Sequence, residues 1–112
     1  MPTYKVHITE HFKKQLKYLL KKNLSLRLTL GHVLRSFNKS NEIFIGQGVY
    51  KVRLAGQSKG KSGGYRLFVL ILEVEGLLTP LCIYSKSDKD DLNKAELSYH
   101  LNKVDAEIKG LL

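Results

Sequence analysis

The sequence has a single cysteine, no long apolar segment and few acidic residues in its first half. One cysteine excludes an internal disulfide, and the apolar run around Cys82 predicts a buried thiol in a reducing compartment. The longest apolar run, residues 67–72, is far too short to span a bilayer, and residues 1–12 carry scattered charges instead of an apolar targeting core. We therefore expect a cytoplasmic chain with no membrane partner.

Positive charge is concentrated in the first half of the chain. The length of 112 residues is ordinary for one domain, which we expect to span 1–112, and a hydrophobic share of 43% is typical of a folded core. Residues 1–60 hold 12 of the 19 basic residues but only 2 of the 10 acidic ones. Such clustering indicates a polyanionic partner. The alternative is a basic surface that serves solubility or an acidic protein partner.

The N-terminal third predicts one strand and two helices. Alternating apolar residues over 4–8 are typical of a strand that is buried on one face. Thr9 can then cap an amphipathic helix with a lysine-rich outer side. A second helix is expected to start at Asn23 or Ser25. The alternating leucines over 24–30 also fit a strand, but the helical spacing of the apolar residues favours the helix.

The middle of the chain predicts three strands, over 49–55, 65–73 and 77–86. A tight turn joins the last two, so we expect an antiparallel meander. Residues 43–45 add a short extended piece. Pro80 suits the start or an unpaired edge of its strand better than a central position, because proline has no N–H to donate.

A last helix is predicted from Ser87 to the C-terminus. Ser87 or Asp88 would cap it, and Asp90 and Asp91 would lie in its first turn, where carboxylates complement the helix dipole. Asp88, Asp90 and Asp91 could instead hold Mg²⁺, which is the less favoured interpretation. The four histidines do not lie at metal-ligand spacing, and we predict neither a metal nor a cofactor. The fold class is therefore α+β, with an N-terminal strand, two helices, an antiparallel three-strand meander and a C-terminal helix.

Basic residues around the first meander strand are the candidates for binding. Alternation places Lys51 and Arg53 on the side away from the core, spaced to grip one phosphate backbone. The glycine-rich segment 56–64 contains Lys59 and Lys61, a composition suited to phosphate oxygens. It is not a P-loop, because its first glycine lies one residue too close to the Gly-Lys-Ser triplet and a strand follows instead of a helix. A solvated sheet face and a mobile loop would show the same patterns.

Three stretches of the sequence resemble the HigB type of the RelE/ParE toxin superfamily. They are Gly48–Leu54, Lys59–Arg66 and Ile83–Leu92, and the resemblance is strongest over 46–93. The predicted order of strands and helices also matches the compact fold of that family.

The resemblance implies the toxin of a type II toxin-antitoxin pair. Its RelE and HigB branches are ribosome-dependent endoribonucleases that cleave mRNA in the A site without a metal, and their partner is a cognate antitoxin, often one with a helix-turn-helix domain. The positions that match the catalytic basic residues are Lys51, Arg53, Arg66 and Lys86. The additional candidates for RNA contact are Lys59, Lys61 and Tyr65.

In that reaction a ribose 2′-hydroxyl attacks the adjacent phosphate, and cations stabilise the dianionic transition state. Arg53 and Arg66 would hold the phosphate. Lys51 or Lys86 would serve as the base if crowding with other cations favours its neutral form.

Two other functions fit the same residues. The chain has Ser87 and Asn93 where the RelE branch carries a further arginine and a tyrosine, so the acid and the base are not assigned. A ParE-like inhibitor of DNA gyrase that cuts no nucleic acid would share the fold, because fold alone does not decide function. A non-toxic basic RNA-binding domain is the third hypothesis.

Overall fold

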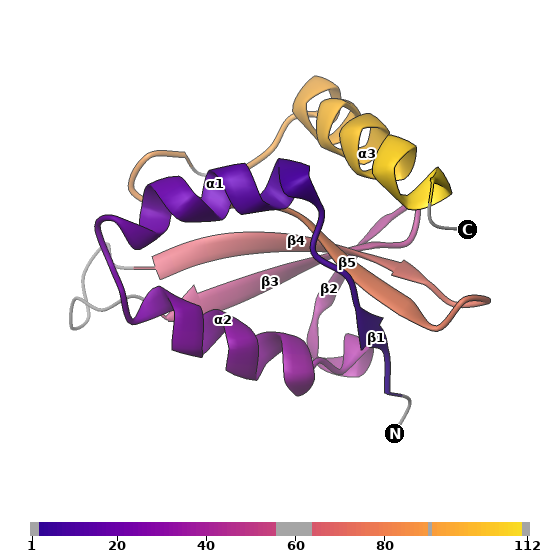
Figure 1. Ribbon diagram of the computed structural model, residues 1–112, viewed down its shortest axis with the longest axis horizontal. Coiled ribbons are helices and arrows are strands. Elements are labelled where there is room, and N and C mark those ends of the chain that lie inside the picture. The colour runs from indigo at the N-terminus through magenta and orange to yellow at the C-terminus, as the bar shows by residue number, and fades with distance from the viewer. Residues whose placement is uncertain (1–2, 56–63, 90, 111–112) are drawn as a thin grey trace.

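The computed structural model describes residues 3–55, 64–89 and 91–110, and its elements follow the predicted α+β order (Figure 1). The helices are α1 (Glu10–Leu20), α2 (Leu26–Arg35) and α3 (Lys94–Lys109), with a short 3-10 helix at Lys39–Asn41. The strands are β1 (Lys5–Val6), β2 (Ile43–Gly46), β3 (Val49–Ala55), β4 (Gly64–Leu72) and β5 (Leu77–Ser85).

The strands form one sheet in the order β1-β5-β4-β3-β2. The pairs β2–β3, β3–β4 and β4–β5 are antiparallel, which confirms the predicted meander, and β1 is parallel to β5. The short extended piece predicted at 43–45 is the edge strand β2. The register places Arg53 opposite Arg66, and Arg66 opposite Tyr84.

Both N-terminal helices form where the sequence predicts them. Thr9 caps α1, because its Oγ1 accepts a hydrogen bond from the Phe12 N–H at 3.1 Å. The four-residue spacing of Leu26, Leu30 and Leu34 decides the ambiguous leucine-rich stretch: these three are buried on one side of α2, and the strand alternative is wrong. Among the described residues, no helix is long and apolar enough to cross a membrane.

The helices cover opposite faces of the sheet. The face under α1 and α2 buries, from the strands, Val52, Leu54, Leu67, Val69, Ile71, Leu78 and Ile83. The face under α3, called here the α3 face, buries Val49, Phe68, Leu70, Leu77, Leu81 and Cys82. The central strands β4 and β5 are thus buried on both sides, and the predicted burial of Cys82 is confirmed.

One side chain of α1 covers the outer edge of β5. The short β1 pairs with only the first two residues of β5. Farther along, the Gln15 amide donates to the Leu81 carbonyl and accepts from the Ile83 N–H, both at 3.2 Å, so it takes the place of a neighbouring strand. Pro80 lies in the middle of β5 and not at its start, on the stretch that β1 does not reach and beside a shift in the β4–β5 register.

The last helix begins later than the sequence predicts. Its N-cap is Asn93, not Ser87 or Asp88. The Asn93 side chain accepts from the Glu96 N–H at 2.8 Å, and the Glu96 carboxylate accepts from the Asn93 N–H at 3.0 Å. This reciprocal capping box satisfies two backbone donors at once, which favours the later start. Asp91 therefore precedes α3 and is not a first-turn acid, while Asp90 lies outside the described residues.

Candidate nucleic-acid interface

Three basic side chains share the α3 face of the sheet. Alternation along β3 and β4 places Lys51, Arg53 and Arg66 on the same side as Val49 and Phe68. Arg53 and Arg66 lie directly opposite each other, and Lys51 follows two residues away along β3. Arg53 is exposed, while Lys51 and Arg66 are partly buried. These three residues are called the cationic row below.

Asp91 supplies a negative charge to the cationic row. Its Oδ2 lies 3.0 Å from the Lys51 Nζ, and only 19% of the lysine side chain is exposed against 57% of the aspartate. Burial alone would raise the pKa of Asp91, but hydrogen bonds from Lys51 and the Leu92 N–H, with the charges of Lys51 and Arg66, lower it. The Lys51 Nζ is thus engaged by a carboxylate, an arrangement that suits phosphate binding better than the role of general base.

Arg66 lies between Arg53 on β3 and Tyr84 on β5. Its Nε is buried and has no hydrogen-bond partner among the described residues. Two like charges directly across strands are destabilising, and so is a buried donor without an acceptor. An anion such as phosphate would relieve both, because its oxygens can accept from the guanidinium and neutralise the pair.

A family model for the RelE toxin of the RelE/RelB toxin-antitoxin system matches residues 4–109. The chain belongs to the RelE toxin family. It is therefore the toxin of a toxin-antitoxin pair. The HigB branch within the superfamily stays a prediction.

Solved structures share the fold of this RelE-family toxin. A free Escherichia coli RelE carrying two arginine-to-alanine mutations is 19% identical, with a TM-score of 0.52 over 91% of this chain and 98% of that one. The RelBE-type toxin-antitoxin complex of Mycobacterium tuberculosis contains a chain that is 18% identical, with a TM-score of 0.53 over 79% of this chain and 97% of that one. A chain of the intact E. coli RelBE complex is 21% identical, with a TM-score of 0.50 over 71% of this chain and 93% of that one. No curated protein matches the chain in a direct sequence comparison.

One remaining basic candidate of this RelE-family toxin, Lys86, lies near the end of the row. Lys86 follows β5 and is exposed, and its backbone N–H donates to the Gly64 carbonyl at 2.9 Å, so it lies beside the start of β4. Lys59 and Lys61 lie outside the described residues. The described residues on either side of them, Ala55 and Gly64, pair directly at this end of the sheet.

Tyr65 lies away from the cationic row. Its ring packs with the buried residues beneath α1 and α2, and its hydroxyl accepts a hydrogen bond from the Asn23 Nδ2 at 3.2 Å. Strand alternation explains this placement, because Tyr65 and Arg66 are neighbours in sequence and must point to opposite faces.

Tyr84 is a member of the site that sequence reasoning missed. It lies opposite Arg66 on the α3 face, and its ring stacks on Phe68 with centroids 6.1 Å apart and an angle of 27° between the ring planes. The sequence held a signal for this placement: Tyr84 is two residues after Cys82, so it points to the same face of β5, and that strand pairs with the strand of Arg66. An aromatic ring beside a guanidinium is a surface on which a nucleotide base can stack.

The two helices α1 and α3 meet through a pair of histidines. His11 Nε2 and His100 Nδ1 lie 2.7 Å apart, although 89 positions separate them in the sequence. Burial, then the charges of His11 and Lys89, lower the pKa of His100 to about 4, so the ring is neutral near pH 7. His11 also lines an open hollow of about 410 Å³, together with Glu10, Lys14, Gln15, Tyr99, Lys103 and Glu107. The described residues contain no group of three or more side chains that could hold a metal.

Proposed function

We propose that this RelE-family toxin is an endoribonuclease that acts in the cytoplasm, where it cuts translated mRNA in the ribosomal A site without a metal ion. The observation that carries this proposal is the cationic row. Three basic side chains from adjacent strands share one sheet face, and one of them has a buried donor that lacks an acceptor among the described residues. This arrangement fits a phosphodiester in a nucleic-acid strand.

The chemistry assigned to the row is stabilisation of a phosphate on which charge develops. The 2′-hydroxyl of a ribose attacks the adjacent phosphorus, the bond to the 5′-oxygen of the next nucleotide breaks, and a 2′,3′-cyclic phosphate forms. Arg53 and Arg66 hold the non-bridging oxygens, and Lys51 adds a third positive charge. The base that takes the 2′ proton and the acid that protonates the leaving oxygen are not assigned. Lys51 is paired with Asp91, and Ser87 and Asn93 stand where the RelE branch carries a further arginine and a tyrosine.

The ribosome has a definite role in this proposal. A site that offers cations but no assigned acid or base is a weak catalyst on its own. Fixing the mRNA so that the 2′-hydroxyl is in line with the leaving oxygen supplies a large part of the rate enhancement in such reactions. We therefore expect cleavage of translated message and little cleavage of free RNA.

The partner that restrains this activity is proposed to be an antitoxin whose acidic surface covers the cationic row. The chain carries a net charge of +9, and two of the similar solved structures are complexes of a toxin with its antitoxin. A helix-turn-helix domain in that antitoxin is the expectation from the family resemblance. Charge complementarity would favour fast association.

The deciding experiment is induced expression of the chain in a bacterial host, followed by primer extension on a translated reporter mRNA and on an untranslatable twin. We expect cuts in the translated message only. Growth arrest with intact transcripts would contradict the nuclease and favour a gyrase inhibitor. Free growth without an antitoxin would contradict the toxin activity as a whole.

Arg66→Ala tests the site within the same assay. Removal of one oxyanion-stabilising group costs a factor of about 10²–10³ in rate, so we expect cuts to disappear. Arg27→Ala, which removes an exposed arginine from α2, is the matched control and should cut like the wild type. Equal cleavage by Arg66→Ala would show that the row is not the site.

A further inference from the structure

Asp91 contacts the cationic row at Lys51 but comes from outside the sheet. It belongs to the segment between β5 and α3, which approaches β3 at Lys51. The sequence predicts a first-turn helix acid here, so this contact between residues 40 positions apart is a property of the tertiary structure. The question is therefore what this carboxylate does beside the candidate phosphate site.

Both oxygens of Asp91 are engaged. Oδ1 accepts the Leu92 N–H at 2.8 Å, and Oδ2 accepts from the Lys51 Nζ at 3.0 Å. The chain that follows Asp91 is itself anchored: Leu92 packs against the buried cluster of the α3 face, and Asn93 forms the capping box of α3. The carboxylate is therefore held by the backbone, and through it α3 fixes where the Lys51 ammonium lies.

Lysine needs such a constraint more than arginine does. Its ammonium is carried on a flexible chain of four carbons, whereas a guanidinium is planar and presents its donors in a fixed fork. Next to Arg53 and Arg66, an unpaired Lys51 would turn away from two like charges. The ion pair opposes this movement. An ammonium has three donors, so two remain for phosphate oxygens after one goes to Asp91.

We infer that Asp91 is a positioning residue of the candidate nuclease site: it holds the Lys51 ammonium in the cationic row, ready for the scissile phosphate. The inference rests on the proposed function. Asp91 acts through Lys51 and contributes orientation, while Lys51 provides the charge that meets the phosphate. A displacement of about 1 Å at such a group can cost a factor of about 10² in rate.

Asp91→Asn is the informative variant because it keeps the shape of the side chain. An amide has one acceptor oxygen, so it can serve the Leu92 N–H or Lys51 but not both with the geometry of the carboxylate. We expect the single-turnover rate on ribosomes programmed with mRNA to fall at least tenfold at saturating toxin. Affinity for a 2′-O-methyl RNA strand, which the toxin cannot cut, should stay equal or increase, because a negative charge has been removed.

The control for loss of charge is Asp105→Asn. Asp105 is an exposed acid on α3, and its carboxylate is paired at 3.0 Å with Lys109 and not with a member of the cationic row. Asp105→Asn removes one negative charge from the surface, as Asp91→Asn does. Its cleavage rate should match the wild type. Asp91→Glu, which restores the charge on a longer side chain, should recover part of the lost rate.

The outcomes separate this inference from the proposed function. A wild-type rate for Asp91→Asn would overturn the positioning role and leave the nuclease intact. A parallel loss of rate, RNA affinity and thermal stability would also overturn it, since that pattern marks a purely structural residue. If the wild-type chain itself does not cut translated mRNA, the proposed function fails and the positioning role fails with it.

A second measurement does not depend on cleavage. An ammonium that is held in an ion pair exchanges its protons slowly enough to give a ¹⁵Nζ signal in NMR spectra of the protein, whereas a freely rotating exposed ammonium does not. We expect a Lys51 signal in the wild type that disappears in Asp91→Asn. Its absence from the wild type would overturn the inference.

Discussion

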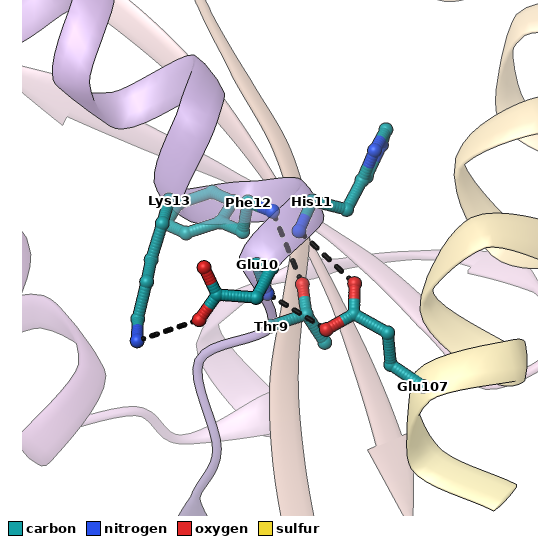
Figure 2. Close-up of polar contacts among 6 residues, drawn as sticks. All are labelled: Thr9, Glu10, His11, Phe12, Lys13 and Glu107. Atoms are coloured by element: carbon teal, nitrogen blue, oxygen red, sulfur yellow. Dashed lines mark hydrogen bonds and ion pairs between the residues drawn. The ribbon is translucent and has the colours of Figure 1, made fainter. Parts of the chain in front are cut away.

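Glu107 on α3 joins that helix to the N-terminus of α1, and this link can be tested by its effect on stability. Figure 2 shows the carboxylate below the first turn of α1, where Oε1 accepts the Glu10 N–H at 2.8 Å and Oε2 accepts the His11 N–H at 3.0 Å. Thr9 serves the third free donor, the Phe12 N–H. The residue thus supplements the N-cap from a different helix and complements the helix dipole.

Glu107→Ala removes both acceptors. Hydrogen bonds to a charged group contribute about 1.5–3 kcal/mol each, but water replaces the carboxylate at this exposed end and offsets much of the loss. We expect a loss of about 1–2 kcal/mol in the free energy of unfolding, similar to the loss of a good N-cap. For a chain of this size the melting temperature should fall by about 4–10 °C. Glu107→Gln, which keeps one acceptor oxygen, should show about half of this effect.

The pH dependence gives the refuting test for Glu107. Burial alone would raise the pKa of Glu107, but the N–H groups of Glu10 and His11 and the charges of His11 and His7 lower it below its ordinary 4.5. The unfolded chain therefore takes up the proton first on acidification, so the contribution is complete above pH 4.5 and is lost as pH falls through the folded pKa. Thermal unfolding at pH 7 and at about pH 3 would measure this. The reasoning would be refuted if the wild type and Glu107→Ala had equal melting temperatures at pH 7. It would also be refuted if the difference between them were the same at pH 3 as at pH 7.

Two further predictions concern the contacts of α1. Gln15→Ala exposes the β5 edge and leaves the Leu81 carbonyl and the Ile83 N–H without their partner. Urea unfolding should therefore show a loss of about 1–3 kcal/mol in the free energy of unfolding. An unchanged urea midpoint would contradict the edge-covering role of Gln15. Because the pKa of His100 is about 4 in the folded chain against 6.5 ordinarily, the unfolded chain binds the extra proton between these values and stability should fall as pH drops from 6.5 to 4. His100→Gln should flatten that slope, which urea midpoints at several pH values would reveal.

The strands and the first two helices could be predicted because their signals are local. Alternation placed the strand at 49–55 with the same bounds as β3, and Thr9 is both the predicted and the observed cap of α1. The start of α3 was predicted wrongly although a local signal for it exists. Ser87, Asp88 and Asn93 all have capping side chains, but only Asn93 is followed three residues later by a glutamate, Glu96, which is the sequence pattern of a capping box.

The candidate site also divides into features with local sequence signals and features that depend on the tertiary structure. Strand parity and register bring Lys51, Arg53 and Arg66 to one face, and parity is visible in the sequence. The contact of Asp91 with Lys51 and that of His11 with His100 join elements far apart along the chain, so spacing rules do not reach them. Parity could also have excluded Tyr65 from the row, because Arg66 is its direct neighbour.

The late start of α3 ties the stability of that helix to the candidate site. Asn93→Ala removes the acceptor for the Glu96 N–H and should cost about 0.5–2 kcal/mol, as the loss of an N-cap does. Asp91 lies two residues before this cap, and its Oδ1 is held by the backbone of Leu92, so fraying of the first turn should also loosen Lys51. We therefore expect Asn93→Ala to lower the cleavage rate, whereas Glu107→Ala, with a similar loss of stability at the other end of α3, should not. Equal rates for the two variants, measured on programmed ribosomes where both are fully folded, would show that the cap does not act on the site.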